Sequence, residues 1–319
     1  MCELTSFLAP LIRAFILYRK ASGRWNEVSY EVNLRLFDKH CEKCYPNAVE
    51  LSQDMVNSWC AQRKTETNNS CRSRIYPVVS FIRYLSKRKM TTVAEPDIPR
   101  EEPRTYIPHA FTEAELKNFF AACDSISATP AKEEQLSRRI TIPVFFRLLY
   151  SSGIRTNEAR MLKREDVDLD DGVLNIRYSK GHAQHYVVLH DTMLSLMRQY
   201  DNSIGKMYPA RAYFFPARNG SFHTASWVQQ NFNKMWRQYN SGNAVPYALR
   251  HYYAIENINS WTDVRFDFNA KLFYLSKSMG HSVLESTKYY YSLVPGLVDI
   301  IEAQTDEDAI IPEVDYESH

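Results

Sequence analysis

A proline-rich stretch at residues 91–109 restricts the fold of this chain more than any other feature. It reads TTVAEPDIPREEPRTYIPH, with four prolines and no helical periodicity, which is typical of a linker. Directly after it, Thr112-Glu113-Ala114-Glu115 matches a capping box, the pattern that starts a helix. The 319 residues also exceed the size of about 250–300 residues at which a single core stops growing. We therefore predict an N-terminal domain over 1–95, a linker over 96–109, a second domain over 110–295 and a tail over 296–319.

The part before the linker has the periodicity of helices. Apolar residues recur at spacings of three and four near residues 7–17 and 32–37, and again within 52–63 and 69–87. Such spacing is expected of the buried face of an amphipathic helix. The N-terminal domain is therefore predicted to be helical.

The part after the linker mixes helices with two short strands. Residues 140–151 are apolar enough for a buried helix, which Gly153 can end in the left-handed conformation, and a second helix begins near Thr156. Residues 174–178 and 185–189 alternate at period two around a turn, which predicts an antiparallel hairpin. Further helices are expected at 191–200, 224–239, 247–259 and 270–279. The predicted fold class is mainly α with a small antiparallel β-sheet (α+β).

Charge is distributed unevenly along the chain. Residues 61–90 hold eight Lys or Arg and one acid, a balance of +7, whereas residues 301–319 hold seven acids and no Lys or Arg. A basic face suits a polyanion such as DNA, although charge alone also fits a solvated helix face. The acidic tail is expected to be mobile or to dock on another protomer. The candidate DNA-binding residues are Arg72, Arg74, Arg83, Lys87 and Arg88.

Composition argues against several other classes of protein. No run of about 18 or more apolar residues occurs, so no membrane partner is expected. The six cysteines are irregularly spaced and follow no secretion signal, so free thiols in a reducing compartment are expected. The pair Cys41 and Cys44 beside His40 lacks a second ligand pair at regular spacing. We therefore predict no metal site and no cofactor.

Four short segments contain residues suited to phosphate chemistry. They are Gly153-Ile154-Arg155-Thr156-Asn157-Glu158, Lys180 at the hairpin tip, Tyr247-Ala248-Leu249-Arg250-His251, and the run from Met279-Gly280-His281 to Tyr289-Tyr290-Tyr291. Each alone has an ordinary interpretation. Arg155 and Glu158 can form a helix ion pair, a lysine can solubilise a turn, and a tyrosine triplet is usually packing. Their occurrence together, in this order, is what favours a functional interpretation.

Taken together, the four segments resemble the tyrosine recombinase (phage integrase) family over about residues 110–295. The resemblance identifies Arg155 and Arg250 as the family's two arginines, Lys180 as its hairpin lysine, and His281 as the histidine nine residues before the nucleophile. Counting nine from His281 gives Tyr290, with Tyr289 and Tyr291 as the neighbouring alternatives. The resemblance implies a helical core-binding domain before a catalytic domain, and Glu158 as a residue that supports the site without acting on DNA. It also implies a site-specific recombinase that acts as a homo-tetramer on double-stranded DNA through a Holliday junction, and it allows for an accessory directionality factor. Such an enzyme is expected in the cytoplasm, bound to DNA.

The chemistry of strand exchange explains why these residue types belong together. Rejoining DNA without an energy cofactor requires the phosphodiester bond to be stored on a protein nucleophile, here a tyrosine that forms a 3′-phosphotyrosyl intermediate. Two arginines can hold the non-bridging phosphate oxygens through bidentate hydrogen bonds as charge develops in the transition state. Lys180 can protonate the departing 5′ oxygen. No metal is needed for these steps.

The sequence departs from the family pattern at one site position. A histidine usually stands three residues before the second arginine, and this chain has Tyr247 there. A phenol can donate a hydrogen bond to phosphate, but it ionises near pH ~10 and is a poor base at neutral pH. We expect Tyr247 to belong to the site, and the neighbouring His251 to be a structural helix residue.

Two rival functions share this fold. A type IB-like topoisomerase uses the same chemistry to relax supercoils as a monomer. A DNA-binding protein of the same fold that lost catalysis is the rival outside enzymes. The presence of both arginines, Lys180, His281 and Tyr290 favours an active enzyme.

Overall fold

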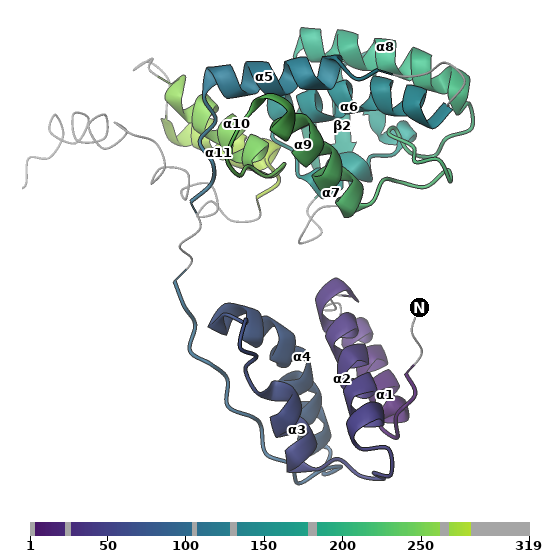
Figure 1. Ribbon diagram of the computed structural model, residues 1–319, viewed down its shortest axis with the longest axis vertical. Helices are drawn as coiled ribbons and strands as arrows, with labels where there is room; N and C mark the ends of the chain where they lie inside the picture. The colour runs from purple at the N-terminus through teal and green to yellow at the C-terminus, as the bar shows by residue number, and fades with distance from the viewer. Residues whose placement is uncertain are drawn as a thin grey trace, which may run out of the picture. The chain divides into compact units, whose positions relative to one another are not determined.

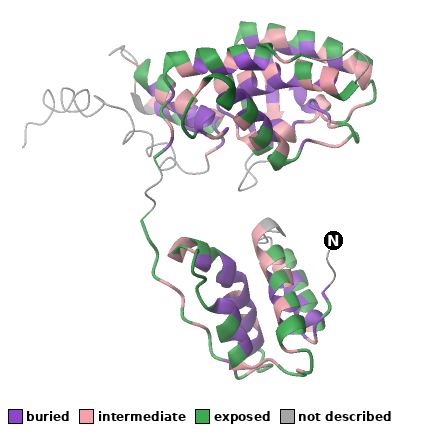
Figure 2. Ribbon diagram, viewed as in Figure 1, coloured by how far each residue is buried: buried purple, intermediate pink, exposed green. Residues whose placement is uncertain are grey.

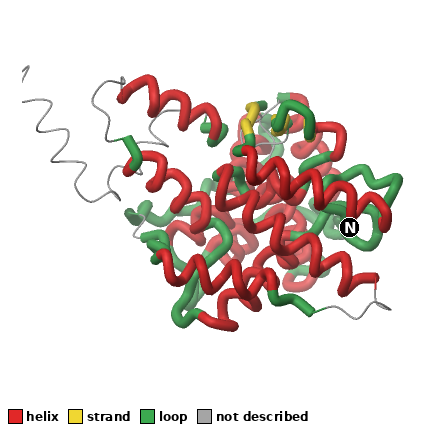
Figure 3. Tube along the Cα trace, turned by 90° about the horizontal axis from the view of Figure 1, so that it is seen from above, coloured by secondary structure: helices red, strands yellow, loops and turns green. Residues whose placement is uncertain are grey.

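The computed structural model describes residues 4–22, 27–103, 107–127, 133–177, 184–261 and 268–281. The chain divides into two compact units, Met1–Tyr106 and Ile107–His319. Figure 1 shows helices in both units and the strands in the second one only. The described parts are mostly helical with one small sheet (Figure 3), so the predicted fold class is confirmed.

The N-terminal unit is built from helices around its own core. Its elements are α1 (Ala9–Ala21), a π-helical turn (Glu27–Glu31), α2 (Val32–Cys44), α3 (Gln53–Cys60) and α4 (Asn68–Lys87). Ser52 and Thr67 cap α3 and α4 by accepting hydrogen bonds from backbone N–H groups of the first turn, which satisfies donors that a helix start leaves free. Each helix turns one buried stripe inward (Figure 2), and Phe15, Phe37 and Phe81 are fully buried there.

Arg74 lies in this core, which corrects its prediction as a DNA-binding residue. Its side chain is 7% exposed and forms an ion pair with Glu66 at 2.7 Å, while its guanidinium also donates to the carbonyls of Trp59 and Ala61. The hydrogen bond from Arg74 lowers the pKa of Glu66 from 4.5 to about 2. A buried guanidinium needs such partners because burying an unpaired charge is costly. Arg74 therefore connects α4 to the end of α3.

The first part of the proline-rich stretch is bound to the N-terminal unit. Val93 belongs to the core, Gln53 exchanges two hydrogen bonds with the backbone of Ala94, and Asn69 exchanges two with the backbone of Glu102. We expected 96–109 to be a linker; residues up to at least 102 run along α3 and α4 instead. The side-chain amides of α3 and α4 thus satisfy backbone groups of a segment that has no regular secondary structure of its own.

This segment also pairs with two of the predicted DNA-binding arginines. Arg83 makes two hydrogen bonds with Glu95, at 2.8 and 2.6 Å. Arg72 donates to the carbonyl of Pro99 at 2.7 Å and lies 3.4 Å from the Glu101 carboxylate. Acids from outside the basic stretch therefore offset part of its charge.

Lys87 and Arg88, at the end of α4, are exposed. The Arg88 guanidinium lies over the rings of Tyr84 and Tyr18, 3.9 and 4.8 Å from their centres. Stacking of this kind holds a guanidinium at the surface while leaving its N–H groups accessible.

The C-terminal unit combines helices with a three-stranded antiparallel sheet. Its helices are α5 (Glu113–Asp124), α6 (Glu133–Ser152), α7 (Thr156–Arg160), a 3-10 turn (Arg164–Asp166), α8 (Asp191–Met207), α9 (Ala225–Tyr239), α10 (Ala248–Asn259) and α11 (Phe268–Ser278). The strands are β1 (Val167–Asp168), β2 (Val173–Ile176) and β3 (His185–Val188), in that order across the sheet. β1 was not predicted, since two residues show no periodicity. The capping box at Thr112 and Glu115 is confirmed.

Helix α6 lies at the centre of this unit. It packs against α5, α8 and α10, and Phe145, Phe146 and Leu148 are fully buried on it. Figure 2 shows buried residues along most of its length. The apolar run that predicted this helix is thus explained, because neighbours on several sides require apolar residues all around a helix. Its C-terminal end carries the first sequence motif.

The ion pair of Arg74 predicts that replacing this arginine destabilises the N-terminal unit more than replacing an exposed arginine does. Arg74→Met leaves the Glu66 carboxylate buried without its partner and should lower the stability of the N-terminal unit by about 3 kcal/mol. Arg83→Met removes a pair whose side chains are 51% and 43% exposed and should cost less than about 1 kcal/mol. Hydrogen exchange of α4 peptides in the full chain measures both losses, and equal losses would contradict the structural role of Arg74.

The same pair predicts a pH dependence. Because the pKa of Glu66 is lowered to about 2, the stabilisation is complete above its ordinary pKa of 4.5 and is lost as the pH falls toward 2. Glu66→Gln should remove this part of the acid sensitivity of the unit.

Candidate active site

The first motif begins at the turn that follows α6. Gly153 has a φ of +62°, a conformation that costs L-residues about 1–2 kcal/mol. A Cβ at this position would also overlap the ring of Tyr253 on α10. Glycine is therefore required here both by the backbone and by the contact with α10. The turn directs the chain into Arg155, which lies at the N-terminus of α7.

Arg155 is held by Glu158, one turn into α7. The backbone N–H of Arg155 donates to Glu158 Oε2 at 2.8 Å, and Nη1 donates to Oε1 at 2.6 Å. The Glu158 side chain is 1% exposed and that of Arg155 is 16% exposed. Nη2 of Arg155 donates to the carbonyl of Gly280 at 3.0 Å. The carboxylate thus orients the guanidinium, and the guanidinium connects the first motif to the turn after α11.

Arg250 reaches the same turn from α10. This residue is 1% exposed, and its guanidinium donates to the carbonyl of Gly153 at 2.5 Å and to that of Met279 at 2.7 Å. Arg155 and Arg250 therefore bind the carbonyls of two consecutive residues, 280 and 279. Three motifs that are far apart in the sequence meet at this point.

His281 completes the turn. Its Nε2 lies 2.9 Å from Nη2 of Arg250, and because a guanidinium only donates, Nε2 is the acceptor. Burial, together with the positive charges of Arg250 and Arg155, lowers the pKa of His281 to about 4. At neutral pH the ring is therefore uncharged and carries its proton on Nδ1.

Tyr247 lies at the edge of the site rather than in its buried centre. It is the residue before α10, is 40% exposed, and its ring meets that of His251 edge-on at 5.1 Å. Burial, together with the charge of Arg250, lowers the pKa of His251 to about 4, so this ring is neutral. Tyr247 also lines a cavity of 150 Å³ with Thr156 and Arg160 of α7.

The sequence interpretation did not include His185, although the structure brings it to the same place. It is the first residue of β3 and is 8% exposed. Its Nε2 lies 4.0 Å from Glu158 Oε2, and it faces Gly280. The signal in the sequence was a polar residue at a position that the alternation of β3 assigns to the buried face.

The remaining predicted catalytic residues lie outside the described residues. They are Lys180 in the hairpin and Tyr290, together with its neighbours Tyr289 and Tyr291. The described structure therefore brings together Arg155, Glu158, Arg250 and His281, with Tyr247 and His251 beside them.

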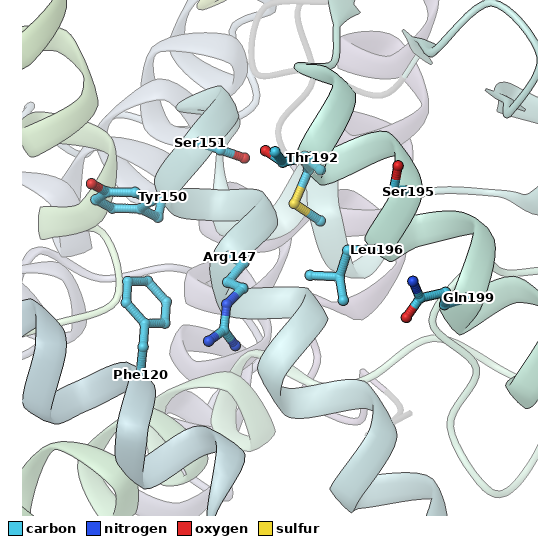
Figure 4. A pocket seen from close by; sticks show the side chains of 9 residues that line it. Phe120, Arg147, Tyr150, Ser151, Thr192, Ser195, Leu196 and Gln199 are labelled. Carbon is cyan, nitrogen blue, oxygen red and sulfur yellow. The ribbon is translucent and has the colours of Figure 1, made fainter.

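A larger cavity lies elsewhere in the C-terminal unit. Its volume is 440 Å³, and residues of α5, α6 and α8 line it, among them Phe120, Arg147, Tyr150 and Leu196. Figure 4 shows these side chains around the opening. Arg147 is paired with Asp124 through two hydrogen bonds of 2.7 Å. None of the motif residues lines this cavity, so it is distinct from the candidate active site.

The comparison with protein families matches residues 109–295 to the model described as "Phage integrase family". The match covers more than half of the chain and includes all four motifs. The chain belongs to the phage integrase family. This identification agrees with the resemblance inferred from the motifs.

Similar curated proteins carry recombinase names. A Sinorhizobium fredii protein named as an integrase/recombinase, y4rE, is 30% identical over 201 residues, which are 61% of this chain and 62% of that protein. The tyrosine recombinase XerC of Chlamydia caviae is 24% identical over 274 residues, 82% of this chain and 75% of XerC. The chain thus spans about three fifths of the length of y4rE and three quarters of that XerC.

Solved structures of this family share the fold. XerH recombinase, in a post-cleavage complex with palindromic difH substrate, has a TM-score of 0.60 at 16% identity and covers 87% of this chain and 78% of that chain. The Tn1549 transposon integrase in complex with transposon right end DNA has a TM-score of 0.61 at 12% identity, with 93% and 98% covered. The likeness extends over both units of the phage integrase chain.

The described residues form neither a membrane-spanning helix nor a metal-binding cluster. None of the helices placed in the structure is long and apolar enough to cross a membrane. Likewise, the part of the chain that the structure describes has no group of three or more His, Cys, Asp or Glu placed to hold a metal ion.

The contact of Gly153 with Tyr253 of α10 predicts that a larger residue at position 153 lowers the stability of the C-terminal unit. Gly153→Ala adds the backbone strain of a positive φ and a clash with the Tyr253 ring, for a total of about 3 kcal/mol. Gly220→Ala is the matched control, because Gly220 has a φ of +75° and no atom within 4 Å of an added Cβ; it should cost about 1 kcal/mol. Urea unfolding of the full chain compares the two, and equal midpoints would refute the close contact with Tyr253.

Proposed function

We propose that this chain is a site-specific DNA recombinase of the tyrosine type, which cuts and rejoins strands through a 3′-phosphotyrosyl intermediate on Tyr290. The observation that carries the proposal is the convergence of three motifs on one turn. Arg155 and Arg250 donate to the consecutive carbonyls of Gly280 and Met279, and His281 follows directly. The family membership and the DNA complexes of XerH and the Tn1549 integrase support this function.

The two arginines are the groups that would bind the scissile phosphate. A guanidinium stays charged at any working pH and presents several N–H donors in one plane, which matches phosphate oxygens. The carbonyls of Gly153, Met279 and Gly280, together with Glu158, hold both guanidinium groups in place before DNA arrives. Donors that are oriented in advance stabilise the charge of the transition state without reorganising during the reaction.

His281 and Tyr247 would add neutral hydrogen-bond donors to the same phosphate. With a pKa of about 4, His281 is uncharged at pH 7 and offers its Nδ1–H. Tyr247 offers its hydroxyl from the rim, where His251 supports its ring. Neutral donors orient the phosphate, while the two arginines supply the charge.

The transfer step itself would use Tyr290 and Lys180. The Tyr290 oxygen attacks phosphorus and passes its proton to water, while the bond from phosphorus to the 5′ oxygen breaks. Lys180 gives its proton to that departing oxygen, which leaves as a 5′ hydroxyl. The reverse sequence of steps joins a new 5′ hydroxyl to the stored phosphate, so no energy cofactor is consumed.

The N-terminal unit would grip the DNA backbone as a core-binding domain. Lys87 and Arg88 are exposed at the end of α4 and are free of acidic partners in the hydrogen bonds and ion pairs described for them. Arg72 and Arg83 share their charge with Glu101 and Glu95, so they would contribute less unless phosphate displaces those carboxylates. Contacts of this kind depend on salt, because each neutralised phosphate releases counterions.

Two rivals remain to be separated by activity. A type IB-like topoisomerase would relax a supercoiled plasmid that contains no special site, whereas a recombinase requires its target sequence. A DNA-binding protein without catalysis would bind DNA and form no covalent adduct. The buried arrangement of both arginines with His281 favours an active enzyme.

The proposed nucleophile predicts a covalent adduct with DNA. Incubation with nicked duplexes, including sequences that flank the chain's own coding locus, should give an SDS-resistant adduct that mass spectrometry places on Tyr290. Tyr290→Phe should abolish the adduct, because it removes the attacking oxygen.

Tyr289→Phe and Tyr291→Phe are the matched controls and should retain the adduct. An adduct that persists in Tyr290→Phe and disappears in one of the neighbouring variants would move the nucleophile by one residue. DNA binding by the intact chain without any adduct would favour the non-catalytic rival.

The tail predicts a defect in assembly. We propose that the enzyme acts as a homo-tetramer on double-stranded DNA, with residues 296–319 docking on a neighbouring protomer and an accessory factor setting the direction. Exchange of a terminal element is an efficient way to couple protomers. Deletion of 296–319 should reduce synaptic complexes on gels while leaving the binding of a single site intact. Normal assembly and recombination by the truncated chain would refute the docking role.

A further inference from the structure

Arg160, the last residue of α7, is partly buried and lies among uncharged partners. Its Nε donates to Asn157 Oδ1 at 2.8 Å, and its Nη1 donates to the carbonyl of His223 at 3.0 Å. The guanidinium also lies over the ring of Phe222, 5.1 Å from its centre. Burial lowers the pKa of Arg160, and within the described part of the chain no acidic neighbour raises it. The side chain is therefore fixed in orientation while its positive charge stays uncompensated.

Other arginines of the C-terminal unit have acidic partners. Arg147 pairs with Asp124 at 2.7 Å, and Arg164 pairs with Asp201 at 2.7 Å. Such pairs offset the cost of taking a charge out of water. Arg160 has no such compensation among the described residues, so an anion from outside the chain would meet an oriented guanidinium whose charge is not neutralised.

Arg160 also lines the cavity beside Tyr247. The cavity has a volume of 150 Å³, and its lining comes from α7, from α9 and from the residues before α10, with Thr156 and Gln229 among them. Of the described residues that line it, none is acidic. A water molecule takes about 30 Å³, so the cavity has room for a phosphate group. Hydroxyl, amide and guanidinium groups on its lining residues are hydrogen-bond donors, which phosphate oxygens accept.

Helix α7 has an arginine at each end. Arg155 directly precedes its first residue, and Arg160 is its last. Five residues of α-helix rise by about 7.5 Å, and the phosphates of one DNA strand follow one another every ~3.4 Å along the duplex axis. A strand whose scissile phosphate is bound by Arg155 can therefore present a neighbouring phosphate to Arg160.

We infer that Arg160 binds a second backbone phosphate of DNA, next to the scissile one, in the cavity that Tyr247 lines. The inference rests on the proposed function, from which it takes DNA as the ligand, and it extends the phosphate contacts beyond the four motifs. Arg160 takes no part in making or breaking bonds; it holds the strand. Because its guanidinium is already oriented by Asn157 and His223, binding needs little further ordering of this side chain.

The salt dependence of DNA binding measures this contact. Each phosphate that a protein neutralises contributes about 0.9 to the slope of log affinity against log salt concentration. Arg160→Gln should therefore reduce the magnitude of the slope by about one and weaken binding by about tenfold. The measurement uses the full chain and the duplexes of the adduct assay. A partly unfolded variant would lower the apparent affinity but leave the slope unchanged, so a loss of folding does not imitate the result.

Two variants serve as matched controls. Arg138 is also partly buried, donates from Nε to Asn231 Oδ1 at 2.7 Å, and has its pKa lowered by burial. It lies in the N-terminal part of α6, about 20 Å along the helix from the end that leads into the first motif. Arg138→Gln removes the same charge and should leave the slope unchanged. Arg160→Lys keeps the charge without the planar fork, so it should retain most of the slope while the affinity falls.

Neutral phosphates locate the contact on the DNA. A methylphosphonate replaces one charged oxygen of a chosen phosphate by a methyl group. Placed in turn at the phosphates that flank the trapped cleavage site, it should weaken binding of the unchanged chain about tenfold at the position that Arg160 contacts. At that position it should weaken binding of Arg160→Gln less than about twofold, because the interaction is already absent.

Three results overturn the phosphate contact of Arg160. They are an unchanged slope in Arg160→Gln, an equal change of slope in Arg138→Gln, and methylphosphonate penalties that are the same with and without Arg160 at every position. Failure of the proposed function looks different, because the unchanged chain would then form no adduct on Tyr290 with any duplex. The salt slope is obtained from binding alone, so the two results are independent.

Discussion

The burial of the Arg250 guanidinium is the constraint on which the C-terminal unit depends. A charge that is 1% exposed must be surrounded by acceptors, because removing it from water without partners costs far more than folding can supply. The acceptors are the carbonyls of Gly153 and Met279 and the Nε2 of His281. These lie at sequence separations of 97, 29 and 31 residues from Arg250, so satisfying one side chain brings the ends of α6 and α11 to α10.

Two glycines make this convergence sterically feasible. At Gly153 the chain leaves α6 with its carbonyl directed at Arg250, and the ring of Tyr253 packs where a Cβ would lie. At Gly280 the ring of His185 packs where a Cβ would lie. The described acceptors of the Arg250 guanidinium include the backbone carbonyls of Gly153 and Met279, which carry no net charge. They satisfy its donors without cancelling its charge, and that charge adds to the burial of His281 in lowering the pKa of this histidine to about 4. The proposed phosphate site and the junction of α6, α10 and α11 therefore rest on the same contacts.

The N-terminal unit uses arginine differently. Its basic stretch of +7 is not one continuous basic surface. Arg74 is buried and paired with Glu66. Arg72 and Arg83 form ion pairs with Glu101 and Glu95, which lie in the segment after α4. At the end of α4, Arg88 is exposed and stacks on two tyrosines. Arginine therefore connects two helices at position 74 and stays exposed at position 88, because the two side chains have different neighbours.

The contrast between Arg74 and Arg88 shows where sequence reasoning ends. Helices with their caps, the glycine stop after α6, the hairpin strands and the four ordered motifs all follow from local patterns, because periodicity, capping and φ preference act over a few residues. The family could therefore be inferred from the chain alone. The pairing of Arg74 with Glu66, the binding of residues 93–102 along α3 and α4, and the packing of His185 on Gly280 could not be. Each depends on a partner that only the folded chain brings within contact, and the identity of that partner, not the residue's own type, decides whether a charge serves the core or the site.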